Sequence, residues 1–323
     1  METDYPCDEL EFAERFGTEE GCRAYLERLR WPDGFVCPRC GHRVGWKIRR
    51  QQYQCAACLY PVSVTAGTIL QDTHKPLRLW FRTAWYVTGQ KYGASALGLQ
   101  RVLGLGSYVT AWSWLHKLRR AMVRPGRDAL SGRVEVDETY VGGLAEGKRG
   151  RGSANKALVA IAAAEEGEGI GRIRMARVRD ASAASLHAFI RSAVLVGSVV
   201  HTDAWEGYTG LGQQGYEHEI TCLRGQGKEA ASQLLPRVHR VASLLKRWLL
   251  GTHQGAVRPD HLDYYLDEFT FRFNRRTSRS RGKLFYRLLQ QVVQVEPCPY
   301  KEMVGGRPMP AHPKPYGVLA STK

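Results

Sequence analysis

Two Cys-x-x-Cys pairs near the N-terminus constrain the fold of this chain more than any other sequence feature. The pairs are Cys37-Pro38-Arg39-Cys40 and Cys55-Ala56-Ala57-Cys58, with fourteen residues between them. Each pair presents two thiolates on one side of a tight turn, and two such turns complete a tetrahedral four-sulfur zinc shell. A redox pair is the alternative, but that motif normally stands alone beside a strand–helix unit. The spacing therefore predicts a zinc ribbon with one structural Zn²⁺ held by all four thiolates.

The charge of the chain indicates a polyanionic partner, because its formal net charge is +16 and its pI is near 9.6. The basic residues gather around 43–50, 117–127 and 272–287, each near aromatic residues. One basic cluster is usually a solvated face, but three with aromatic neighbours favour nucleic acid over an anionic membrane surface. The basic residues of the ribbon could equally form a protein-docking surface. The nucleic-acid-binding candidates are Arg49, Arg50, Arg119, Arg120, Arg275, Arg276 and Arg279.

The region between the ribbon and residue 128 is predicted to be helical. Its apolar and aromatic residues recur at helical spacing, and Gly104-Leu105-Gly106-Ser107 separates the last two helices. A short helix, a tight turn with glycine and a second helix fit a helix-turn-helix, although an ordinary three-helix bundle is just as compatible.

The region after residue 128 is predicted to be α/β, since three strands, a helix and returning strands are typical of that class. The expected strands are 132–141, 157–164, 171–179, 197–203 and 217–222, and the expected helices are 182–195 and 236–250. Basic, glycine-rich stretches at 142–156 and 224–228 are expected to be mobile loops. The predicted domains are a helical segment (1–30), the zinc ribbon (31–70), a helix-turn-helix-like DNA-binding region (71–128), an α/β domain (129–295) and a Pro-rich tail (296–323).

Three polar residues in the α/β region stand where separate elements would bring them together. Asp137 lies within the expected strand 132–141, Asp203 ends the expected strand 197–203, and His239 is near the start of the expected helix 236–250. A lone aspartate at a strand end is usually a turn former. Two aspartates in this order, ahead of a basic helix, instead suggest the hard oxygen ligands that two metal ions about 3.5–4 Å apart need for phosphoryl transfer.

Taken together, these parts resemble the insertion-sequence transposases that pair an N-terminal zinc ribbon with a DDE-type, ribonuclease-H-like catalytic domain. The resemblance extends over essentially the whole chain. It depends on the stretches Cys37-Pro38-Arg39-Cys40-Gly41, Ser63-Val64-Thr65-Ala66-Gly67-Thr68, Val134-Glu135-Val136-Asp137-Glu138-Thr139-Tyr140, His201-Thr202-Asp203, Ser243-Leu244-Leu245-Lys246-Arg247 and Tyr265-Leu266-Asp267-Glu268-Phe269-Thr270-Phe271-Arg272-Phe273-Asn274-Arg275-Arg276.

The resemblance implies which residues form the active site. In such proteins one aspartate lies on the first core strand, a second ends the fourth, and a third ligand lies on a following helix, seven residues before a lysine. These roles fall on Asp137, Asp203 and His239, with Lys246 directed at a phosphate or the transition-state charge. Histidine departs from the acidic pattern, and as a neutral ligand it suits Mn²⁺ better than Mg²⁺. Glu268 is the rival acidic ligand.

The resemblance also implies the reaction and the partners. We expect a transposase that cleaves and transfers strands at the element's ends with Mg²⁺ or Mn²⁺, bound to double-stranded DNA of the terminal inverted repeats and the target as a homodimer or higher synaptic assembly. A catalytically inactive DNA-binding regulator, and less so a nuclease without strand transfer, are the alternatives. Apolar runs are too short for a membrane span, and residues 1–12 are acidic, unlike a secretory signal. The expected location is the bacterial cytoplasm, on the nucleoid when DNA is bound.

Overall fold

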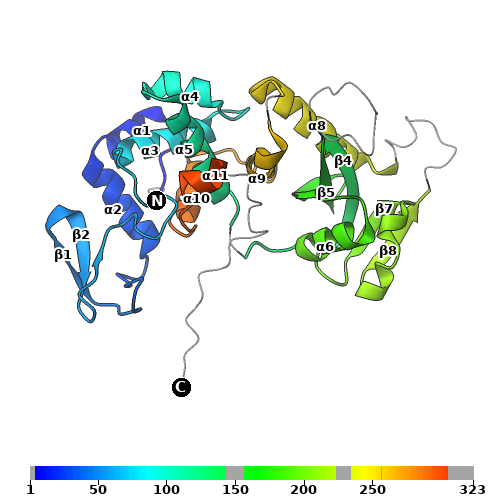
Figure 1. Ribbon diagram of the computed structural model, residues 1–323, viewed down its shortest axis with the longest axis horizontal. Helices are drawn as coiled ribbons and strands as arrows, with labels where there is room; N and C mark the ends of the chain where they lie inside the picture. The colour runs from blue at the N-terminus through cyan, green and yellow to red at the C-terminus, as the bar shows by residue number, and fades with distance from the viewer. Residues whose placement is uncertain (1–3, 125, 143–155, 223–233, 256, 305–323) are drawn as a thin grey trace. The chain divides into compact units, whose positions relative to one another are not determined.

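The computed structural model describes residues 4–124, 126–142, 156–222, 234–255 and 257–304 (Figure 1). The chain divides into two compact units, Met1–Gly126 with Ser278–Lys323, and Arg127–Thr277. Most of the loop expected at 142–156, all of the loop at 224–228 and the tail beyond 304 lie outside the described residues. In the described part of the chain, no helix is long and apolar enough to cross a membrane.

The first unit contains a small three-stranded antiparallel sheet, ordered β1-β2-β3. Its strands are β1 (Gly45–Ile48), β2 (Gln52–Cys55) and β3 (Pro61–Val62), with a 3₁₀ turn at Arg49–Gln51. The buried residues that support it are Trp31, Phe35, Cys37, Cys55 and Val62. Because so small a core buries little apolar surface, bound metal would contribute much of the ribbon's stability.

Helices form the rest of the first unit around an aromatic core. They are α1 (Glu9–Arg15), α2 (Glu19–Arg30), α3 (Leu77–Gly89), α4 (Ala96–Leu103), α5 (Tyr108–Ala121), α10 (Arg281–Val292) and α11 (Tyr300–Val304). Phe285 of α10 is fully buried, and its ring centroid lies 5.5 Å from those of Phe12 and Phe16 and 5.9 Å from that of Phe81. The sequence analysis placed α10 with the catalytic domain, but its apolar face packs on α3, α5 and α2. Periodicity predicts such a helix without specifying which core it joins.

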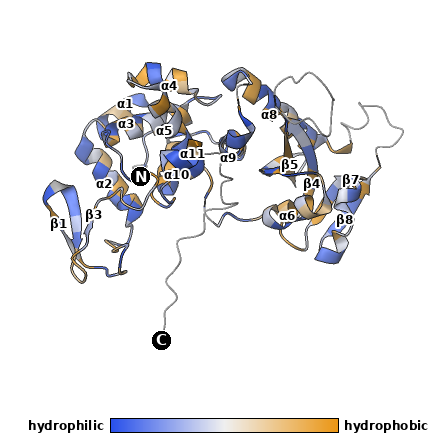
Figure 2. Ribbon diagram, viewed as in Figure 1, coloured by the Kyte–Doolittle hydropathy of each residue, from blue (hydrophilic) through white to orange (hydrophobic). Residues whose placement is uncertain are grey.

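The helices α3, α4 and α5 pack on one another within this unit. Trp80 of α3 stacks on Trp114 of α5 with ring centroids 4.1 Å apart. Gly104 ends α4 at a φ of 61°, and the Ser107 side chain caps α5. Hydrophobic residues of α4 are visible in Figure 2, and one of them, Val102, is exposed. Both a helix-turn-helix and a simple bundle fit this arrangement, so the DNA-binding role of 71–128 stays a prediction.

The second unit is built on a five-stranded mixed sheet, ordered β6-β5-β4-β7-β8. Its elements are β4 (Arg133–Val141), β5 (Ala157–Glu166), β6 (Gly169–Val178), α6 (Ala183–Ala193), β7 (Val199–Asp203), β8 (Glu217–Thr221), α8 (Pro236–His253) and α9 (Leu262–Phe273), with 3₁₀ turns at Glu206–Tyr208, Gly212–Gln214 and Pro259–His261. β4, β5 and β6 are antiparallel, whereas β7 is parallel to β4 and β8 to β7. This arrangement confirms the expected α/β, ribonuclease-H-like fold.

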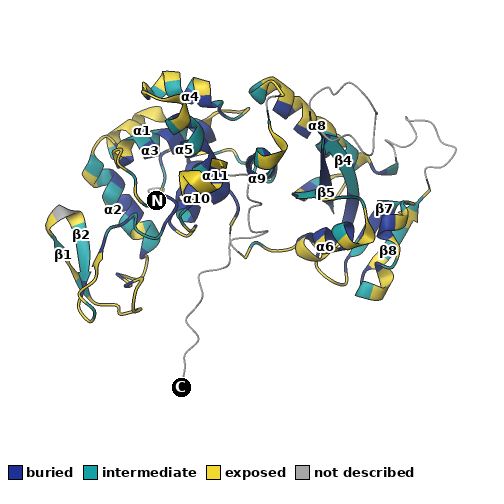
Figure 3. Cartoon of the chain, viewed as in Figure 1, coloured by how far each residue is buried: buried dark blue, intermediate teal, exposed yellow. Residues whose placement is uncertain are grey.

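The alternation of β4 decides which side chains face which layer. Val134 and Val136 are fully buried in the core that α6 covers, and β5 beside them is also buried (Figure 3). Glu135 and Asp137 have the opposite parity and interact with residues of α8. The acidic side chains of β4 that bear on the candidate site therefore lie on the α8 face of the sheet.

Candidate active site

The four cysteine sulfurs of the ribbon lie within 4.8 Å of one another. Cys37 and Cys58 are 3.7 Å apart, and Cys40 and Cys55 are 3.6 Å apart. A tetrahedral zinc with bonds of about 2.3 Å separates its sulfurs by about 3.8 Å, close to both distances. Burial acts to raise the pKa of the Cys55 thiol, but hydrogen bonds from the backbone amides of Cys58 and Ala57 and from the Cys40 and Cys58 thiols together lower the pKa to about 6. The cluster supports the expected structural zinc, and four thiolate ligands leave no open position for a substrate.

Asp137 and His239 face each other across β4 and the first turn of α8. Nδ1 of His239 is 3.8 Å from Oδ2 of Asp137. This is too long for a hydrogen bond. For one ion to bind both atoms as neighbouring ligands at about 2.1 Å, the two atoms would have to come closer, to roughly 3 Å.

The surroundings of Asp137 disfavour the ionised form of its carboxyl group unless a positive charge neutralises it. Burial raises the pKa of its carboxyl group to about 7, and the neighbouring charges of Glu138 and Asp203 act in the same direction. Lys246 acts in the opposite direction, and burial in turn lowers the pKa of Lys246. Asp203 and Lys246 thus lie close enough to Asp137 to perturb its titration. A bound cation would take the place of the proton on the Asp137 carboxyl group.

Asp203 and Glu138 are held by different partners. The backbone amide of Trp205 donates to Oδ1 of Asp203 at 3.0 Å, which orients that carboxylate at the end of β7. Glu138 points to the opposite face of the sheet from Asp137 and accepts from the hydroxyl of the fully buried Tyr208 at 2.8 Å. Of the two adjacent acids on β4, only Asp137 therefore faces α8.

The residues present fit a divalent cation in their donor types. Among the described residues, Nε2 of His239 is buried and makes no hydrogen bond, so this nitrogen is available as a ligand. Across the described ranges, only the four cysteines bring three or more ligand atoms within 4.8 Å of one another. Asp137, Asp203 and His239 therefore form a more open group than the zinc cluster.

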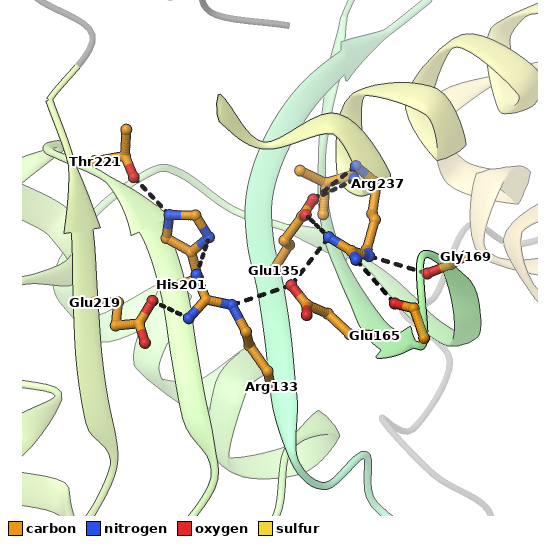
Figure 4. A network of polar contacts seen from close by, with 10 residues as sticks. Arg133, Glu135, Glu165, Gly169, His201, Glu219, Thr221 and Arg237 are labelled. Carbon is orange, nitrogen blue, oxygen red and sulfur yellow. Dashed lines mark hydrogen bonds and ion pairs between the residues drawn. The ribbon is translucent and has the colours of Figure 1, made fainter. Parts of the chain in front are cut away.

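Glu135 fixes the start of α8 to β4 (Figure 4). Its carboxylate accepts from the backbone amides of Arg237 at 2.7 Å and Val238 at 3.0 Å, and from the Arg237 guanidinium at 3.0 Å. The side chain of Leu235, the N-cap residue of α8, makes no capping hydrogen bond. A strand carboxylate therefore caps α8, where the helix dipole favours negative charge. His239 is the next residue after Val238, so this cap sets its position opposite Asp137.

Two arginines extend this cap into a network across the sheet (Figure 4). Arg237 also pairs with Glu165 of β5 at 3.0 Å, and donates to two carbonyl groups in the β5–β6 turn. Arg133 of β4 pairs with the same Glu165 at 3.0 Å, with Glu219 of β8, and contacts His201 of β7 at 3.3 Å. Arg237 thereby ties the start of α8 to β4, β5 and the first residue of β6, and Arg133 links Glu165 onward to β7 and β8.

The sequence analysis did not single out Glu135 or Arg237 as site residues. The available signal was spacing: Glu135 lies two residues before Asp137 on the same strand face, and Arg237 lies two residues before His239. A glutamate at a strand position that is buried needs a charged partner. Local pattern does not name a partner that is 102 residues away.

Glu268, the rival third ligand, is occupied elsewhere. It lies on α9, is only 1% exposed, and pairs with Arg272 at 2.8 Å. A carboxylate that is shielded and neutralised in this way is poorly placed to hold a catalytic ion. The geometry favours His239 for this role.

The arginines expected to contact DNA differ in exposure. Arg49, Arg276 and Arg279 are exposed, and the side chain of Arg50 is outside the described part of the structure. Arg119 and Arg120 are only 2% and 8% exposed, because the basic end of α5 turns into the helical core, and Arg119 donates to the carbonyl of residue 94. The structure thus argues against direct phosphate contact by these two.

Arg275 and Arg276 are engaged within the second unit. Arg275 lies over the ring of Phe271 at 4.1 Å and donates to its carbonyl at 3.2 Å. Arg276 lies over Phe273 at 4.2 Å and donates to the carbonyls of residues 170 and 171 on β6. Both serve as packing contacts in this structure.

Two family models match the chain. The ISXO2-like transposase domain of the IS1595 type matches residues 129–274, and the IS1595 transposase zinc-ribbon domain matches residues 17–60. No curated protein matches the chain. The first match includes Asp137, Asp203 and His239, and the second includes all four clustered cysteines.

Proposed function

We propose that this chain, which belongs to the IS1595 family of DDE transposases, cleaves DNA at the ends of an insertion sequence and joins those ends to target DNA. The observation that carries the proposal is the meeting of Asp137 and His239 at 3.8 Å, within the electrostatic reach of Asp203 and Lys246. Three elements, β4, β7 and α8, supply these residues, as a phosphoryl-transfer site requires.

The role of each of these four residues would follow from the chemistry of its side chain. Bound Mg²⁺ or Mn²⁺ would supply activation of the attacking oxygen and neutralisation of phosphate charge. Asp137 and Asp203 would provide the anionic ligands, and His239 a neutral nitrogen that favours Mn²⁺. The Lys246 ammonium would lie beside the phosphate and stabilise its transition-state charge.

Each of the two steps exchanges one bond at phosphorus for another. In cleavage, a water oxygen bonds to phosphorus, the bond from phosphorus to the 3′ oxygen breaks, and a 3′ hydroxyl remains on the element. In transfer, that 3′ oxygen bonds to a target phosphorus and the target's own 3′ oxygen leaves with a proton. No net oxidation occurs in either step, so acids, bases and cations suffice.

The first unit would bind the DNA. Its zinc ribbon presents the exposed Arg49 and Trp46 on a metal-held platform, and both side chains suit contact with a polyanion. We propose that the ribbon and the helices of 71–128 bind the terminal repeats. Pairing of two ends would then require a dimer or a larger assembly.

An inactive DNA-binding regulator is the less favoured alternative. A regulator has no need of a carboxyl group such as Asp137, which is costly to ionise in its buried setting. The buried position of Asp137 opposite His239 therefore favours catalysis.

The proposal is tested with full-length protein, Mn²⁺ or Mg²⁺, and labelled duplexes that carry the ends of the element encoding this chain. Wild type should cut and join. Asp137→Asn and Asp203→Asn should bind the same duplexes but lose cutting by at least about a hundredfold, because each nearly isosteric change removes an anionic ligand. The matched control is Glu168→Gln, an exposed acid in the β5–β6 turn, which should cut normally. Cutting at the wild-type rate by either aspartate variant would reject the site.

The role of His239 is tested separately. His239→Ala should lose most cutting, whereas His239→Glu should retain Mg²⁺-dependent cutting, because glutamate restores an anionic oxygen ligand. If both variants cut as wild type does, His239 is a structural residue.

A further inference from the structure

A cavity of about 850 Å³ in the second unit has Trp205, two residues after Asp203, in its lining. It is lined by the end of β4, the start of α6 and the turn after β7. Tyr140, which contributes to the lining, has the same strand parity as Val134 and Val136, so the cavity is on the α6 face of the sheet. The cavity therefore lies at the C-terminal end of β4, on the opposite face of the sheet from Asp137 and His239.

The walls of this cavity are connected directly to the candidate catalytic residues. Trp205 lines the cavity, and its backbone amide is the group that donates to Asp203 at 3.0 Å. Its indole N–H donates to the carbonyl of Ala181 at 2.8 Å, so the ring has a fixed orientation. Tyr140 lies three residues beyond Asp137 on the same strand. A ligand in the cavity would thus be next to whatever occupies the site at Asp203.

The chemistry of the lining combines aromatic and cationic groups. Lys156 and the exposed Arg179 contribute positive charge, and Trp205 and Tyr140 contribute aromatic surface. Asp180, which also lines the cavity, lies just before α6: it accepts from the Ser182 amide at 3.1 Å, from the hydroxyls of Ser182 and Ser185, and from the Arg179 guanidinium at 3.1 Å. These hydrogen bonds lower the pKa of Asp180.

We propose that this cavity binds one unstacked nucleotide of the substrate DNA, from the strand that passes Asp203. The base would stack on Trp205 and Tyr140, and Lys156 and Arg179 would contact its flanking phosphates. The exposed Glu206 and Thr209 at the same cavity supply polar groups for the edge of the base. A phosphate group alone would leave most of this volume and both aromatic rings unused, whereas the volume falls within the range of about 300–1,000 Å³ for small-molecule sites. This inference rests on the proposed function and specifies how its DNA would be held.

Photocrosslinking with the unaltered pocket gives the first test. Duplexes of the element's ends carry 5-iodouracil singly at each position within three nucleotides of the cleavage site, and they are bound to full-length Asp137→Asn protein. Irradiation followed by peptide mass spectrometry should give one position that crosslinks to Trp205 or Tyr140. Crosslinks that map only outside the cavity would overturn the proposal.

Paired variants give the second test. Tyr140→Ala should reduce cutting of the element's ends by about tenfold, since it removes a stacking surface, while Tyr140→Phe, which keeps the ring, should reduce cutting less than Tyr140→Ala does. Replacing the crosslinked nucleotide with an abasic residue should abolish the difference between Tyr140→Ala and wild type. Equal loss on intact and abasic duplexes would show that Tyr140 supports the fold and not a base.

Failure of this inference is distinguishable from failure of the proposed function. A wild-type protein that cuts and joins DNA, with crosslinks elsewhere and an unaffected Tyr140→Ala variant, rejects the nucleotide site alone. A wild-type protein that does not cut, or aspartate variants that do, rejects the proposed function.

Discussion

Glu135 and Arg237 are 102 positions apart in the sequence and are joined by two hydrogen bonds, one to the Arg237 backbone amide at 2.7 Å and one to its guanidinium at 3.0 Å. The strand that presents Asp137 is therefore also the strand that caps the helix presenting His239. One carboxylate fixes the spacing between two proposed ligands, and this gives β4 a second role in the site.

Substitution of Glu135 should weaken metal binding before it unfolds the protein. Glu135→Gln keeps the shape of the side chain but removes the charge that faces Arg237 and the start of α8. We expect cutting to need at least about tenfold more Mn²⁺ for half-maximal rate, with about 1–3 kcal/mol lost from stability, the usual cost of weakening a buried charged pair. Arg240→Gln, an exposed change on the same helix, is the matched control. An unchanged Mn²⁺ requirement in a destabilised Glu135→Gln protein would assign Glu135 to folding alone.

The buried carboxyl of Asp137 should make the metal-free protein sensitive to pH. Its pKa is about 7 when folded, against an ordinary value of 3.8, so the folded state holds this proton more tightly than the unfolded state. Stability from this group is complete below about pH 4 and is lost as pH rises through about 7. With zinc bound in the ribbon and no Mg²⁺ or Mn²⁺ added, Asp137→Asn should therefore melt at a higher temperature than wild type at pH 8, and the difference should shrink at pH 5. Mn²⁺ should raise the melting temperature of wild type more than that of the variant. A constant difference at both pH values would contradict the raised pKa.

Substitutions of the candidate DNA-binding arginines should differ in how they change the salt dependence of DNA binding. Arg49→Gln and Arg279→Gln should each lower the slope of log affinity against log salt by about 1, because each removes one exposed phosphate contact. Arg276→Gln should leave that slope unchanged and lower the melting temperature, since Arg276 lies over Phe273 and bonds to β6 carbonyls. A reduced slope for Arg276→Gln would show that this side chain leaves its packing contacts to reach DNA.

Elements set by interactions between neighbours in the sequence could be predicted, whereas those set by distant residues could not. Strand β4 is observed at Arg133–Val141 against an expected 132–141, because its alternating pattern is set by neighbours along the chain. The paired cysteines were equally readable from spacing. The burial of Arg119 and the packing of α10 with the first unit depend on residues far away in sequence, and basic or amphipathic pattern alone does not reveal them. The same limit hid Glu135, whose role appears only when α8 lies against β4.

The contact of Gly282 with the N-terminal segment should make it intolerant of any side chain. A Cβ at this position of α10 would occupy the place of the Pro6 carbonyl oxygen and lie 2.8 Å from the Pro6 carbonyl carbon. Backbone atoms yield less readily than flexible side chains, so Gly282→Ala should destabilise the first unit by about 1–3 kcal/mol, as overpacked sites do. Gly89→Ala, at the end of α3 in the same unit, is the matched control: its added methyl meets nothing within 4 Å and should be neutral or slightly stabilising. The measurement is the thermal melt of each full-length variant with zinc bound, and equal melting temperatures would show that α10 does not pack against residues 5 and 6 in solution.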